Sequence, residues 1–98
     1  MFTFKKKQIE VEGQLLDLVE ISAGGYRKFT KTVQENPNDE MLQMGTLLSV
    51  GVEQFKGKTV DQVLDLLTVQ AISDIVPQII ELSGMDDKAD EAEEPKKS

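Results

Sequence analysis

Apolar residues recur along much of this chain at helical spacing, and residues 59–84 hold the densest series. Two stripes follow each other there, Val60, Val63, Leu64 and Leu67 and then Val69, Ile72, Val76, Ile79 and Ile80. Stripes this wide face a hydrophobic core rather than solvent. They predict a short helix over about 59–67, capped by Thr59, then a break at Thr68 and a last helix over 69–83. Because Pro77 cannot donate a backbone hydrogen bond, a kink or restart is expected near Asp74.

Residues 2–21 alternate between apolar and polar positions, as in extended structure. The apolar positions change parity across the lysines at 5–7, which predicts a turn or bulge there with the lysines exposed. A second turn is predicted at Glu12-Gly13, because glycine readily takes a positive φ. The next stretch, LLDLVEI, has apolar residues on both faces of a strand. Together these features predict a hairpin or short meander.

A first helix is predicted over about 22–35, with Ser22 as its N-cap. Gly24 and Gly25 weaken its first turn by roughly 1 kcal/mol each relative to alanine. No phosphate-binding glycine motif surrounds this pair, so the interpretation is close packing of the helix against the hairpin rather than capture of an anion.

Pro37 separates this helix from a second one, predicted over about 39–55 with Asn38 or Asp39 as its cap. Gly45 and Gly51 fall inside the second helix and lower its intrinsic stability. They are interpreted as positions where a neighbouring helix approaches closely. Gly57 is predicted to end this helix as its C′ residue.

The predicted fold class is α+β, an N-terminal β-hairpin or short meander followed by about four helices and mainly helical. Residues 1–84 are predicted to form a single globular domain. Residues 85–98, MDDKADEAEEPKKS, have no apolar periodicity and six acids against three bases. They are predicted to form a disordered acidic tail.

Composition narrows the functional classes. The chain has no cysteine, histidine or tryptophan, which excludes disulfides, thiolate metal sites and the commonest general base. The net charge is −7, and residues 1–84 hold 12 acids against eight bases. This balance disfavours nucleic acid and anionic membranes as partners. No apolar run reaches the roughly 18 residues that a membrane span needs, and no secretory signal is evident, so a cytosolic location is expected.

The sequence holds few candidates for a catalytic or metal-binding site. The carboxylate pairs Asp61–Asp65 and Asp39–Glu40 are interpreted as acids on helix surfaces, and the acids at 86, 87 and 90 lack the calcium-loop pattern. The serines have no histidine to activate them. We therefore predict no catalytic residue, no cofactor and no metal, and an interaction protein rather than an enzyme.

Four stretches together resemble the tail assembly chaperones of long-tailed bacteriophages and prophages, the small proteins encoded before the tape measure protein. They are LVEIS with the following GGYRKF, the apolar MLQMGTLLSVGV, and VDQVLDLLTVQAISDIVPQIIELSG, within residues 2–84. The resemblance is one of layout and hydrophobic pattern. The chain departs from it at the break before the last helix, where many relatives carry proline and this chain has Thr68-Val69.

The resemblance implies a non-catalytic chaperone that binds the coiled-coil-prone tape measure protein in the bacterial cytoplasm and keeps it soluble for tail tube assembly. The resemblance also leaves two further partners open, the tail tube protein and a second copy of this chain. Two alternatives remain open, a structural tail connector or completion protein and an acidic adaptor or inhibitor that mimics DNA. Because the apolar stripes exceed what a small core needs, the partner surface is predicted on the second and last helices, at Met41, Met44, Val52, Phe55, Ile75 and Ile79.

Overall fold

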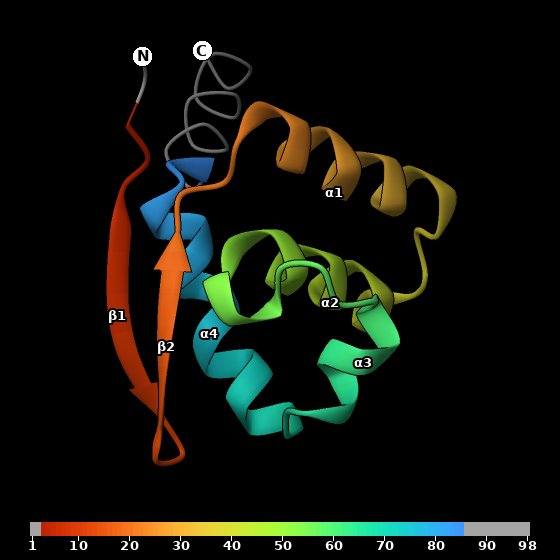
Figure 1. The fold of residues 1–98 in the computed structure, drawn as a ribbon. Helices are drawn as coiled ribbons and strands as arrows, with labels where there is room; N and C mark the ends of the chain where they lie inside the picture. Colours follow the sequence, from red (N-terminus) through yellow and green to blue (C-terminus); the bar gives the residue numbers. More distant parts are fainter. Residues whose placement is uncertain (1–2, 86–98) are drawn as a thin grey trace, which may run out of the picture.

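The structure, a computed structural model, describes residues 3–85, and it has the predicted α+β architecture of a hairpin followed by helices (Figure 1). The predicted acidic tail, apart from Met85, lies outside the described residues. The elements in chain order are β1 (Lys6–Val11), β2 (Gln14–Val19), α1 (Ala23–Glu35), α2 (Glu40–Gly51), the short 3₁₀ helix η1 (Glu53–Phe55), α3 (Val60–Asp65) and α4 (Val69–Leu82).

The hairpin turns at Glu12 and Gly13, as predicted, and both residues have positive φ, 51° and 84°. A two-residue turn of this kind matches the natural twist of paired strands. The turn or bulge predicted at residues 5–7 is wrong. β1 runs through Lys6 and Lys7, which pair with Val19 and Leu18 in an unbroken register. Backbone pairing continues through these lysines without a turn or bulge. The apolar positions change parity only because Phe4 lies before β1 and is not part of its alternation.

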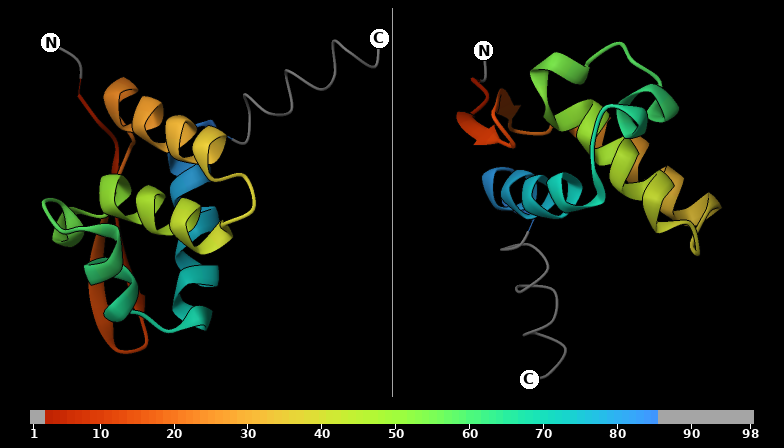
Figure 2. Two further views of the ribbon diagram at one scale, coloured as in Figure 1. Left: turned by 90° about the vertical axis from the view of Figure 1, so that its right-hand side faces the viewer. Right: turned by 90° about the horizontal axis from the view of Figure 1, so that it is seen from below.

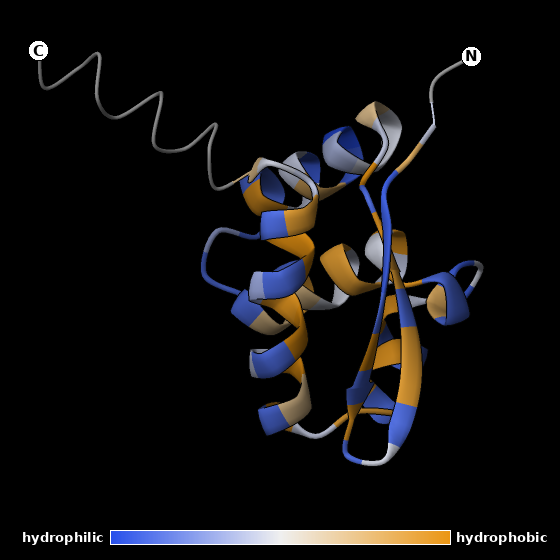
Figure 3. Ribbon diagram, turned by 90° about the vertical axis from the view of Figure 1, so that its left-hand side faces the viewer, coloured by the Kyte–Doolittle hydropathy of each residue, from blue (hydrophilic) through white to orange (hydrophobic). Residues whose placement is uncertain are grey.

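The core lies between one face of the hairpin and the helices. Its most deeply buried large side chains are Leu18, Leu47, Leu48, Val52, Val63, Ile75 and Ile79. Figure 3 shows the apolar side of α4 turned toward the hairpin, with polar positions along its outer side. The two buried polar side chains within residues 3–85, Thr46 and Ser49, donate hydrogen bonds to carbonyl oxygens of α2 itself. Burial therefore leaves neither hydroxyl unsatisfied.

Helix α2 is the centre of the helical layer, with α1 on one side and α3 and α4 on the other (Figure 2). Close approach is possible because Gly45 and Gly51 carry no side chain, as the sequence predicted. A Cβ on Gly45 would lie 2.5 Å from Val60 Cγ1, and one on Gly51 would lie 2.7 Å from Ile79 Cγ2. Gly25 is a close approach on two sides, since its Cβ would lie 3.1 Å from Cγ2 of Ile21, just after β2, and 3.3 Å from Val50 Cβ of α2.

The second helix is shorter than the predicted 39–55. Asp39 caps it as expected, but it ends at Gly51, and Val52 is extended with φ −125° and ψ 124°. Val52 forms an isolated antiparallel bridge with Leu18, so pairing with the hairpin ends the helix. A 3₁₀ turn follows. The prediction that Gly57 ends the second helix is wrong, because Gly57 comes after this turn, although it does take a positive φ, 86°.

The break at Thr68 is confirmed. Of the kink or restart predicted near Asp74, the restart is wrong, and the kink stays a prediction. Helix α4 is continuous from Val69 to Leu82 through Pro77. The buried residues Ile75 and Ile79 lie on either side of the exposed proline, and we attribute the continuity of the helix to their packing. None of the helices within residues 3–85 is long and apolar enough to cross a membrane.

The Gly51 contact predicts a measurable stability loss. Gly51→Ala places a methyl group against the stiff β-branched side chain of Ile79, and overpacking of this kind costs about 1–3 kcal/mol of unfolding free energy. Urea denaturation measures the change. Gly24→Ala is the matched control, since its Cβ would meet only Ser22 Oγ at 3.9 Å and should cause no loss. Equal stability of the two variants would contradict the close-approach interpretation.

A second prediction concerns Thr68, whose hydroxyl joins α4 to the hairpin turn. Its oxygen accepts from Ala71 N at 3.0 Å and its proton is donated to Glu12 Oε2 at 2.9 Å. Thr68→Ala removes the N-cap and should lower the free energy of unfolding by about 1 kcal/mol. Thr68→Ser keeps the hydroxyl and should lose less than half as much by the same measurement. A serine variant as unstable as the alanine variant would rule out the cap as the cause.

Candidate functional site

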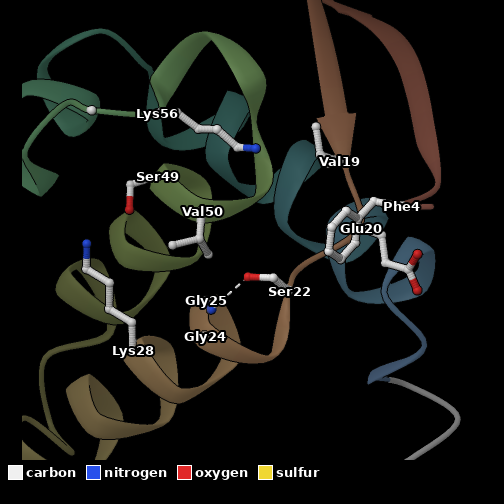
Figure 4. A pocket seen from close by; sticks show the side chains of 11 residues that line it. Phe4, Val19, Glu20, Ser22, Gly24, Gly25, Lys28, Ser49, Val50 and Lys56 are labelled. Atoms are coloured by element: carbon white, nitrogen blue, oxygen red, sulfur yellow. Dashed lines mark hydrogen bonds between the residues drawn. The ribbon is translucent and has the colours of Figure 1, made fainter. Parts of the chain in front are cut away.

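A hollow lies where the end of the hairpin meets the start of α1 and the end of α2 (Figure 4). Its volume is about 380 Å³. It is open to solvent on one side, and residues from distant parts of the chain line it, namely Phe4, Val19, Glu20, Ser22, Gly24, Gly25, Lys28, Ser49, Val50, Lys56 and Gly57. The site therefore exists only in the folded chain.

The start of α1 shapes one wall of this hollow. Ser22 is extended and its hydroxyl accepts a hydrogen bond from Gly25 N at 3.1 Å, which fixes where the helix begins. Gly25 brings the helix close to Val50 of α2, whereas the position of a Gly24 Cβ is nearly free of neighbours. With no side chain at either glycine, the wall stays open.

The lining combines apolar surface with charges of both signs. Phe4 is 46% exposed, Val50 is half-buried and Val19 is buried. Lys28 reaches the hollow from α1 and Lys56 from the segment after η1. The Glu20 carboxylate, at the end of the hairpin, is directed away from both lysines (Figure 4) and accepts from Lys5 N at 3.0 Å. Lys56 also lies 3.7 Å from Glu53, but both side chains are about half exposed and such a pair contributes little. The lysines thus remain able to bind a negatively charged partner.

Two hydroxyls in the lining already serve structural roles. Ser22 caps α1, and the buried Ser49 donates to the Thr46 carbonyl at 2.8 Å. Within residues 3–85, no three side chains of the metal-binding types come together. What the hollow offers chemically is apolar surface from Phe4, Val19 and Val50 beside polar and charged groups. That combination suits binding of a peptide segment.

The structure corrects most of the partner surface predicted from the sequence. Val52, Phe55, Ile75 and Ile79 are all buried, with exposed fractions of 0–4%. They belong to the core between the hairpin, α2 and α4, so the prediction that they lie on an exposed part of the helices is wrong for this fold. The apolar stripes looked wider than one core needs because the hairpin also packs against them.

Met41 and Met44 are the two predicted partner residues outside the fully buried core. Met41 is 37% exposed, while Met44 is half-buried against the core. Both lie near the start of α2, and Val50 is nine residues beyond Met41, about 13 Å along the helix. The structure does not bring these methionines to the hollow.

The carboxylate pairs lie at the surface. Asp61 and Asp65 are exposed on α3, and Asp39 is the cap of α2, accepting from Leu42 N at 3.1 Å, with exposed Glu40 beside it. The acids at 86, 87 and 90 lie outside the described residues.

The lining residues Phe4, Val50, Lys28 and Lys56 were not singled out from the sequence. Phe4 resembled an ordinary strand residue, and nothing in the pattern joins residue 4 to residues 50 and 56. The one available signal was Gly24-Gly25, which marked a close approach without saying to what.

Comparison of the chain with protein-family models, with curated proteins and with solved structures gave no match.

Proposed function

We propose that this protein is a non-catalytic tail assembly chaperone of a long-tailed bacteriophage or prophage. It binds the tape measure protein in the bacterial cytoplasm and keeps that long client soluble until the tail tube assembles around it. The partner-binding surface in this proposal is the hollow between the hairpin, α1 and α2, in place of the buried residues of α2 and α4.

The choice of client rests on the resemblance of residues 2–84 to these chaperones in layout and hydrophobic pattern. The observed α+β fold is compatible with that resemblance, because the hairpin and the helices occur in the expected order. The resemblance and the fold both concern the arrangement of elements along the chain, and neither identifies a binding surface.

The observation that carries the proposal is the hollow itself. An exposed phenylalanine beside Val50 gives a partner apolar area to bury, and Lys28 and Lys56 attract acidic groups at its rim. A coiled-coil-prone client presents apolar side chains flanked by charged ones along its helices. One segment of such a client can therefore meet both components of the site at once.

Co-expression with the tape measure protein tests the function. The chaperone should co-purify with the client and raise its soluble fraction several-fold over expression of the client alone. If neither occurs, the proposal is wrong. A structural tail connector would instead remain in finished tails, so finding this protein stoichiometrically in purified virions would also contradict it.

Phe4→Glu tests the site. A charge in place of an apolar anchor should lower the amount of captured client about tenfold, equivalent to about 1.4 kcal/mol of binding free energy. Leu66→Glu is the matched control, because Leu66 is an equally apolar, 56% exposed residue that does not line this hollow. Circular dichroism should show that both variants are folded. If they then capture equal amounts of client, the binding surface does not include this hollow.

A further inference from the structure

The outer edge of β1 is an unpaired strand edge. The sheet has only two strands, and in residues 3–85 nothing pairs with β1 on the side away from β2 (Figure 1). The backbone hydrogen bond from Glu20 N to Lys5 O, 2.8 Å long, identifies which residues face β2. Hydrogen bonding alternates along an antiparallel strand, so Lys5, Lys7, Ile9 and Val11 bond to β2. The backbone groups of Lys6, Gln8 and Glu10 therefore point outward.

The opposite edge of the hairpin is already covered. Leu18 bridges to Val52, and Asp17 N, which also points away from β1, donates to Gln54 Oε1 at 3.0 Å. Gln54 Nε2 in turn donates to Asp17 Oδ2 at 2.9 Å. Among the described residues, the hairpin thus offers one edge to a further strand, the edge of β1.

The side chains along this edge are complementary to themselves. Lys6, Gln8 and Glu10 are exposed and share the outer face of the strand, because Ile9 and Val11 between them turn toward the core. If two copies of β1 run antiparallel with Gln8 opposite Gln8, each Lys6 lies opposite Glu10 of the second copy. The three residues with outward backbone groups then form the hydrogen-bonded pairs. Opposite charges in directly facing positions stabilise an antiparallel pair.

We propose that two copies of this chain associate through their β1 edges into a four-stranded antiparallel sheet, in the register that sets Lys6 against Glu10 of the second copy. The proposal concerns self-association and does not depend on the client proposed above. On the inner face, the same register brings the aliphatic stem of Lys7 beside the half-buried Ile9 of the second copy.

Other registers of the same edge lose this complementarity. A shift by two residues toward the N-terminus puts Lys7 opposite Lys7 at the centre and leaves Glu10 without a cation. A shift the other way puts Lys6 opposite Glu12 in the turn, where the positive φ of 51° ends the strand. A parallel arrangement sets Lys6 against Lys6, and like charges in facing positions are destabilising.

The geometry also predicts that association stops at two copies. The contact uses the same residues on both chains, so it is isologous and has twofold symmetry. Because the other edge of each hairpin is covered, the four-stranded sheet presents no further free edge from these residues. Lysine-rich strand edges resist indiscriminate pairing, and Lys5, Lys6 and Lys7 leave the charge-matched register as the favourable one.

Charge reversal tests the register with the full chain, by sedimentation equilibrium at about 150 mM salt, where the Debye length is about 8 Å. The wild-type protein should dimerise. Lys6→Glu and Glu10→Lys each convert two attractive pairs into two repulsive ones and should raise the dimer dissociation constant at least about tenfold. The double variant K6E/E10K restores opposite charges and should return the constant to within about threefold of wild type.

Lys58→Glu and Glu35→Lys are the matched controls, since both change the net charge equally at exposed positions away from β1 and should leave the constant unchanged. Gln8→Pro removes an outward N–H that β2 does not use and should abolish dimerisation, while Gln8→Ala should not. A wild-type protein that is monomeric at about 1 mM would overturn the proposal. So would a dimer unaffected by either single reversal, or one that the double variant fails to restore.

Discussion

The fold depends on how closely helix α2 meets its neighbours. At Gly45 and Gly51 the backbone of α2 lies against Val60 and Ile79, at separations that leave no room for a methyl group. These contacts place α3 and α4 on the same side of α2 and bring Leu47, Leu48 and Ile79 into one core. A helix with two internal glycines is weak alone, so α2 and its neighbours stabilise one another.

The position of α2 in turn decides where it ends and what its end contacts. Val52 leaves the helix to bridge Leu18, and Gln54 two residues later exchanges hydrogen bonds with Asp17. This segment thereby closes an edge of the hairpin, and the residues on either side of it, Val50 before and Lys56 after, line the hollow. The covered edge of the hairpin and the candidate partner site therefore both depend on where α2 ends. The edge of β1 is left exposed.

The predictions from the sequence are correct where the predicted feature depends only on residues close together in the chain. Ser22, Asp39, Thr59 and Thr68 cap their helices, and Glu12-Gly13 makes the hairpin turn, because each depends on hydrogen bonds or φ within a few residues. The predictions are wrong where contacts with residues distant in the chain change the local structure. Val52 was assigned to a helix because its periodicity is helical, but the hairpin draws it into a bridge. A kink or restart was expected near Asp74. No restart occurs, since α4 is continuous, with Ile75 and Ile79 buried against the core.

The sequence by itself determined the α+β class, the order of elements, the caps and the close approach at the α2 glycines, since composition and short-range spacing carry that information. It did not determine which apolar residues stay at the surface. Four of the six predicted partner residues are core, because a hairpin that pairs with Val52 also covers α2 and α4. Only the tertiary structure brings Phe4 beside Val50 and Lys56, since that proximity depends on the relative placement of elements far apart in the chain.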